Sequence, residues 1–87
     1  MYLILVYDVN VKRVGKVLKT ARKYLHWVQN SVLEGELTEA SFRKLKADFS
    51  HVIDPREDSV LFYVLGDWRY SRRELMGVKK GGEDWVW

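Results

Sequence analysis

An acidic residue at the end of an apolar strand, followed by a basic helix, is the part of this chain best suited to chemistry. Residues 1–7 are almost entirely apolar, and Asp8 follows them. Mg²⁺ commonly binds one or two protein carboxylates together with substrate phosphates, and a metal held this way can promote phosphodiester cleavage. Asp8 is therefore a candidate metal ligand and catalytic residue, with a turn or capping role as the structural alternative. Tyr7, on the other side of the strand, is expected in the core.

Six cations are predicted to lie on the outer face of the helix after Asp8. They are Lys12, Arg13, Lys16, Lys19, Arg22 and Lys23. None has an acidic partner four residues away within the helix, so the helix does not neutralise them itself. Such a face can bind the phosphates of a nucleic-acid backbone, and a solvated helix face is the alternative. The arginines at positions 69, 72 and 73 could extend this basic surface.

Composition narrows the class of protein. The 87 residues carry a net charge of +3, which permits a nucleic-acid partner without requiring one. There is no cysteine, so disulfides and thiol catalysis are excluded. No apolar run reaches the ~18 residues of a membrane span, and no cationic leader precedes the first strand. We expect a cytoplasmic protein without a membrane partner. His26 and His51 lack a second ligand at metal spacing, and Ser31 lacks a base, so none is expected to be catalytic.

Hydrophobic periodicity predicts the order strand–helix–strand–strand–helix–strand. The first expected elements are a strand over 1–8 and a helix over 11–25 that is capped by Asn10. Two short strands within 26–37 follow, joined by a bend at Asn30-Ser31, and then a helix from a Thr38 cap to Asp54-Pro55. An exposed turn over 56–59 leads to a strand over 60–65. The first helix should bury Val11, Val14, Val17, Leu18, Ala21 and Leu25, and the second Phe42, Leu45, Phe49 and Val52 or Ile53. One long kinked strand over 26–37 is the alternative to two.

This order is that of a ferredoxin-like α+β sandwich, in which both helices cover one face of the sheet. The first and last strands are apolar on both sides, so the bare face should be covered by a second copy in a face-to-face homodimer. We expect one domain over 1–87, with a core over about 1–66 and an extension over 67–87. Trp85 and Trp87 could form an extra strand on the partner's sheet, with a frayed tail as the alternative.

Several segments together resemble the CRISPR-associated "Cas two" family. They are residues 2–9, the basic helix, residues 28–32, residues 33–37, residues 57–65 and residues 78–81. The resemblance covers nearly the whole chain. It implies a ferredoxin-like homodimer whose last strand joins the partner's sheet. It also implies a role in spacer acquisition, in which the dimer bridges copies of the "Cas one" integrase and holds duplex DNA.

The resemblance further implies a Mg²⁺-dependent endonuclease activity on RNA or DNA, centred on Asp8. Two positions depart from the family pattern. Trp27 stands where members usually have arginine, and Leu33 where they usually have phenylalanine. The lost arginine removes a candidate phosphate contact and weakens the nuclease interpretation more than the DNA-binding one. A toxin-like or regulatory ferredoxin-fold dimer without a nucleic-acid role is the alternative.

Overall fold

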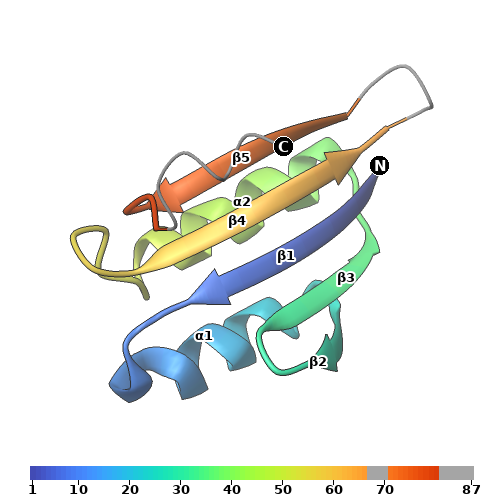
Figure 1. The fold of residues 1–87 in the computed structure, drawn as a ribbon. Coiled ribbons are helices and arrows are strands. Elements are labelled where there is room, and N and C mark those ends of the chain that lie inside the picture. Colours follow the sequence, from blue (N-terminus) through green and yellow to red (C-terminus); the bar gives the residue numbers. More distant parts are fainter. Residues whose placement is uncertain (67–70, 81–87) are drawn as a thin grey trace.

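In the computed structural model, which describes residues 1–66 and 71–80, two α-helices cover one face of a five-stranded antiparallel sheet (Figure 1). The elements are β1 (Tyr2–Asp8), the 3₁₀ helix η1 (Val11–Arg13), α1 (Val14–Ala21), β2 (His26–Gln29), β3 (Val32–Glu36), α2 (Glu39–Ser50), β4 (Ser59–Leu65) and β5 (Ser71–Gly77). The strand order is β2-β3-β1-β4-β5. The first four strands have the ferredoxin-like arrangement, so the predicted fold class is confirmed.

The strand that ends in Asp8 lies in the middle of the sheet. β1 pairs with β3 on one side and with β4 on the other. Its alternate residues Leu3, Leu5 and Tyr7 are buried in the core under the helices. The expectation that Tyr7 is a core residue is confirmed. On the β4 side the pairing reaches Asp8, which lies opposite Ser59, whereas on the β3 side the last hydrogen bond is from the Tyr7 amide to the Ser31 carbonyl oxygen.

The basic helix starts as predicted and is shorter than predicted. The Asn10 side chain accepts a hydrogen bond from the Lys12 amide, so Asn10 is the cap. The first turn is 3₁₀, and the α-helix ends at Ala21 rather than at residue 25. Val11 is 85% exposed, so its assignment to the buried stripe is wrong. Its turn precedes the regular helix and therefore does not share the helical phase of Val17 and Ala21, which are buried.

The second helix packs its aromatic residues on the sheet. Thr38 caps it by accepting a hydrogen bond from the Ser41 amide. The rings of Phe42 and Phe49 lie 5.2 and 6.2 Å from that of Phe62 on β4, measured between ring centroids. The helix ends at Ser50, four residues before Asp54, and turns carry the chain to the proline.

Residues 26–36 form two strands, as predicted. Asn30 and Ser31 connect them, and Asn30 has a φ of 39°. Asparagine tolerates this left-handed conformation better than most residues, which explains its place in the tight hairpin. The alternative of one long kinked strand is excluded.

The sequence analysis did not predict a strand at residues 71–77. Here they form β5, which pairs along the whole of β4 in the same chain and extends the sheet beyond residue 66. β5 alternates half-buried and exposed residues and has charged side chains at Arg72, Arg73 and Glu74, so it lacks the apolar run that identifies β4. Trp85 and Trp87 lie outside the described residues, and their pairing with a partner stays a prediction.

Within residues 1–66 and 71–80, no element covers the face of the sheet opposite the helices, and this open face is largely apolar. Ile4 and Val6 of β1 are partly exposed on it, and Leu65 and Leu75 are each 39% exposed. The described residues contain no helix with the length and apolar character that crossing a bilayer requires.

Candidate active site and nucleic-acid interface

The carboxylate of Asp8 is open to solvent. Asp8 is the last residue of β1, where it pairs with Ser59 of β4, and its side chain is 71% exposed. The ammonium Nζ of Lys80 lies 3.6 Å from Asp8 Oδ2 and donates a hydrogen bond of 3.1 Å to the Asp8 carbonyl oxygen. The structure thus places beside Asp8 a cation that the sequence analysis did not assign to the site.

Among the residues that the structure describes, Asp8 is the carboxylate available to Mg²⁺ at this position. Among residues 1–66 and 71–80, no group of three or more side chains of the metal-binding types comes together. A single accessible carboxylate fits Mg²⁺, because this ion keeps several waters and binds substrate phosphates as well. Asp8 would hold the ion, and water and substrate oxygens would complete its coordination. The predicted metal site is therefore compatible with the donors present.

A buried carboxylate supports the backbone next to Asp8. Asp58 is fully buried, and its oxygens accept hydrogen bonds from the backbone amides of Asn10 (2.9 Å) and Asp54 (2.8 Å). Arg13 donates to the same carboxylate through Nε (2.5 Å) and a terminal nitrogen (3.0 Å). Arg13 also pairs with Glu57 at the surface. We call Asp58 with these partners the Asp58 cluster. It joins the segment after β1 to the turn before β4.

Two expectations change because of the Asp58 cluster. The segment 56–59 is not wholly an exposed turn, since Asp58 and Ser59 are buried. Arg13 is only partly exposed and is paired with two acids, so it is not one of the unneutralised outer cations. Its partners Glu57 and Asp58 follow it in the chain by 44 and 45 positions. The pairing therefore depends on the tertiary fold, and no local spacing could have predicted it.

The ion pair perturbs the protonation of both partners. Hydrogen bonding from Arg13 holds the pKa of Asp58 well below its ordinary value of 3.8, against the opposing effect of burial. The same hydrogen bond raises the pKa of Arg13, with a smaller contribution from Glu57. Asp58 is therefore ionised throughout the neutral range and is structural rather than a proton donor.

The other five predicted cations remain exposed on or beside α1. They are Lys12, Lys16, Lys19, Arg22 and Lys23. Within the described parts of the chain, their side chains form no ion pair. A hollow of about 360 Å³ lies on the surface of α1, lined by Gly15, Leu18, Lys19 and Arg22. This basic, hollowed surface suits a phosphate backbone.

Trp27, which departs from the family pattern, lies against this basic surface. The Arg22 guanidinium carbon is 5.9 Å from the centre of the Trp27 ring, and Trp27 Nε1 donates to the Asn30 carbonyl oxygen. The indole is half-exposed on the edge strand β2. Trp27 stands where members of the family usually have arginine, and its ring contacts the neighbouring Arg22 by a cation–π interaction.

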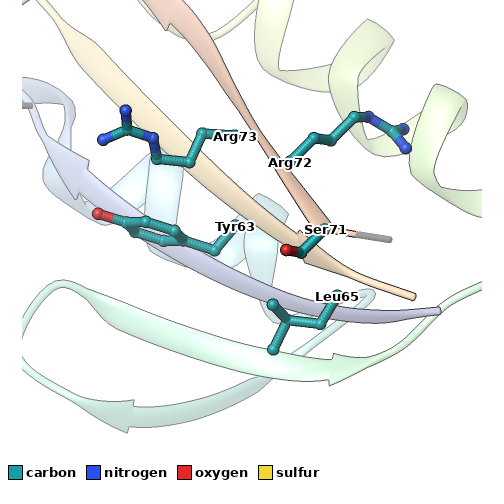
Figure 2. Close-up of a pocket in the computed structure, with 5 residues that line it drawn as sticks. All are labelled: Tyr63, Leu65, Ser71, Arg72 and Arg73. Atoms are coloured by element: carbon teal, nitrogen blue, oxygen red, sulfur yellow. The ribbon is translucent and has the colours of Figure 1, made fainter. Parts of the chain in front are cut away.

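A second hollow lies far from Asp8. Figure 2 shows the five residues that line it, which are Tyr63, Leu65, Ser71, Arg72 and Arg73, with the end of the Arg72 side chain extending towards a helix. Its volume is about 280 Å³. Leu65 and Ser71 are register partners at the opposite end of β4 from Ser59, which pairs with Asp8. The hollow is therefore separate from the Asp8 site.

Comparisons with known proteins assign the family. The family model described as CRISPR associated protein Cas2 matches residues 1–73. The chain belongs to this family. It is 52% identical to the CRISPR-associated endoribonuclease Cas2 of Dictyoglomus turgidum and 56% identical to that of Thermotoga maritima, in each case over 99% of both chains. The resemblance stated from the sequence motifs is confirmed.

Solved structures of the family agree with the fold. One crystal structure of Cas2 has a TM-score of 0.73 and 41% identity, covering 93% of this chain and 91% of that chain. The Streptococcus pyogenes Cas2 structure at pH 6.5 has a TM-score of 0.70 and 38% identity, covering 79% of this chain and 92% of its own. The sheet and helices of this chain therefore match those of its relatives.

Replacing the buried acid should destabilise the fold. Asp58→Asn leaves the Arg13 guanidinium without its buried anion, and removing one partner of a buried pair costs about 3–5 kcal/mol of unfolding free energy. Glu57→Gln, at the exposed end of the same arginine, should cost less than about 1 kcal/mol. Urea unfolding at neutral pH measures both. Equal effects of the two substitutions would show that the buried pair is not the stabilising one.

The same pair predicts a pH dependence. The pKa of Asp58 is lower in the folded state than its ordinary value of 3.8. The ionised carboxylate therefore contributes fully to the unfolding free energy above pH 3.8, and this contribution is lost as the pH falls below 3.8 towards the folded pKa. Between neutral pH and pH 3, the unfolding free energy measured with urea should therefore fall less in Asp58→Asn than in the unsubstituted protein. A steeper loss in the variant would contradict this assignment.

Proposed function

We propose that this Cas2 protein is a Mg²⁺-dependent endonuclease with Asp8 as its metal ligand, and that it binds nucleic-acid phosphates through α1. The observation that carries the proposal is the exposed carboxylate of Asp8 at the end of a central strand, beside Lys80 and a basic helix. The names of the relatives, which are called endoribonucleases, favour RNA as the cleaved substrate.

The chain's own residues have distinct tasks in this proposal. Asp8 binds the metal, and the buried Asp58 cluster holds the adjacent backbone at Asn10, which limits movement of the carboxylate. A bound Mg²⁺ supplies charge stabilisation at the phosphate and makes water more acidic. With one carboxylate ligand in each chain, we expect cleavage to be slow.

Exposed cations around α1 support a second role in holding duplex DNA. Lys16 and Lys19 are exposed on α1, and Arg22 is exposed at its C-cap. Lys19 and Arg22 line the hollow on this helix. Contacts of this kind read the backbone rather than the base sequence. In this proposal the protein holds duplex DNA in the cytoplasm during spacer acquisition and bridges copies of the "Cas one" integrase. Single-stranded RNA is the alternative ligand.

We also propose that the open face of the sheet pairs with the same face of a second copy. Ile4 and Val6 lie on the central strand β1 of that face, Leu65 on the adjacent β4 and Leu75 on the edge strand β5. An apolar sheet face of this kind is commonly covered by another protein surface. A two-fold homodimer would cover it and place two basic helices on one particle.

The substitution Asp8→Asn tests the nuclease. It keeps the size of the side chain and removes the charge that Mg²⁺ requires. Cleavage of single-stranded RNA in Mg²⁺ should fall by at least about 100-fold, since loss of outer-shell support alone costs 10–100-fold. Glu39→Gln, which neutralises an exposed acid on α2, should leave the rate unchanged. Cleavage that persists in Asp8→Asn would remove the nuclease assignment from this residue.

Charge reversal on α1 tests the nucleic-acid interface. The pair Lys16→Glu and Lys19→Glu should weaken duplex DNA binding and reduce the slope of log K against log[salt] by about 2, because about 0.9 counterion is released per phosphate contact. Reversing Arg43 and Lys44 on α2 makes the same change in net charge and should have a smaller effect. Binding that is insensitive to salt, or equal loss in both variants, would favour the toxin-like or regulatory alternative.

Placing a charge at the centre of the open face tests the dimer. Ile4→Asp should convert the protein from dimer to monomer because the paired faces would bury two carboxylates. Sedimentation velocity at micromolar concentration measures the oligomeric state, and circular dichroism checks that the fold is retained. An unsubstituted protein that sediments as a stable monomer would contradict the homodimer.

A further inference from the structure

The Asp8 site contains a lysine that no comparison assigns to it. Lys80 Nζ contacts Asp8 twice, at 3.1 Å from the backbone carbonyl oxygen and at 3.6 Å from Oδ2. The two residues are 72 positions apart in the chain, so the contact is made by the tertiary fold. The lysine side chain is 35% exposed, which leaves part of it accessible to a ligand.

Gly77 directs the chain from β5 back towards Asp8. Its φ is +88°, and a Cβ at this position would lie 2.0 Å from the carbonyl oxygen of Asp58. Only glycine can therefore pass this point without moving the backbone. The next amide, that of Val78, donates a hydrogen bond of 2.8 Å to the same carbonyl oxygen.

Asp58 consequently anchors both halves of the site. Its carboxylate holds the amide of Asn10, two residues after Asp8, and its carbonyl holds the amide of Val78, two residues before Lys80. The Asp58 carboxylate is itself buried and paired with Arg13. A single buried residue thus sets the relative positions of the exposed carboxylate of Asp8 and the partly exposed ammonium of Lys80.

The chemistry of the pair suits a phosphate group beside a metal ion. A lysine ammonium has three donors, and the Asp8 carbonyl accepts one of them. A carboxylate has about four acceptor positions, so contact with one ammonium leaves room for a cation. A phosphate that approached Asp8 would be repelled by the carboxylate, and Lys80 offsets that repulsion.

We propose that Lys80 binds a non-bridging oxygen of the substrate phosphate held at Asp8. This inference rests on the proposed nuclease function and adds a substrate-binding residue to it. The alternative is a purely structural ion pair, but a pair this exposed adds little to folding stability. In the absence of substrate, Lys80 is also a positive charge that opposes binding of a metal to Asp8.

These two effects of Lys80 have opposite signs, and a single substitution separates them. Lys80→Met removes the charge and retains most of the side chain's volume. Affinity for a short fluorescein-labelled polyuridine RNA, measured by anisotropy with Ca²⁺ replacing Mg²⁺, should fall about tenfold through loss of a charge-assisted contact. Affinity for Mn²⁺ without RNA, measured by electron paramagnetic resonance, should rise several-fold because a like charge is removed.

Matched variants make the result specific. Lys79→Met changes the net charge equally at the exposed residue before Lys80 and should change neither affinity by more than about twofold, since solvent and salt screen an exposed charge. Lys80→Arg retains the charge and should keep most of the RNA affinity. Lys80→Gln provides a second neutral variant, and circular dichroism checks the fold of each.

The outcomes distinguish the two proposals. If Asp8→Asn abolishes cleavage and Mn²⁺ binding but Lys80→Met has the same RNA and Mn²⁺ affinities as Lys79→Met, Lys80 is only structural and this inference is wrong. If Asp8→Asn changes neither cleavage nor Mn²⁺ binding, the metal site is elsewhere and both proposals are overturned. Opposite shifts in RNA and Mn²⁺ affinity, confined to the neutral Lys80 variants, would support the inference.

Discussion

The buried ion pair between Asp58 and Arg13 is the interaction on which this end of the molecule depends. An ionised carboxylate that is fully buried is tolerated only when its oxygens are satisfied, and here two backbone amides and a guanidinium satisfy them. Each donor belongs to a different segment: the turn after β1, the 3₁₀ helix, and the turn before β4. The Asp58 carboxylate therefore fixes the chain after β1, the 3₁₀ helix η1 and the chain before β4 relative to one another. Its hydrogen bonds, more than its charge, connect the fold to the candidate site.

The sheet separates two kinds of surface. On one face, side chains of β1 and β4 pack under α1 and α2 and form the core. On the other face, the same strands expose Ile4, Val6 and Leu65 at the next positions along the chain. A strand reverses side-chain direction at every residue, so an almost continuous apolar run supplies both surfaces. The core face accounts for the fold, and the open face motivates the proposed dimer.

Some charged side chains near the candidate site stabilise the fold, and others are exposed where they can contact a ligand. Arg13, which the sequence pattern grouped with the recognition cations, is paired with Asp58 and stabilises the fold. Lys16 and Lys19 remain exposed on α1, where a solvated charge costs little and a phosphate can approach. Trp27 contacts Arg22 by a cation–π interaction at the edge of the sheet. Lys80 reaches Asp8 from a segment that the sequence analysis left without a role.

The sequence alone determined the features that depend on local periodicity and turn chemistry. The apolar runs of β1 and β4, the caps Asn10 and Thr38, and the Asn30-Ser31 hairpin follow from preferences that act within a few residues. They were enough to predict the ferredoxin-like fold and the position of Asp8 at a strand end, while the order of several short motifs carried the resemblance to the family. Tertiary structure alone decided β5, the burial of Asp58 and the place of Lys80. β5 is formed by its pairing with β4, because its own residues lack an apolar run. Asp58 pairs with Arg13 across 45 positions and Lys80 contacts Asp8 across 72, and only the paired strands bring such distant groups into contact.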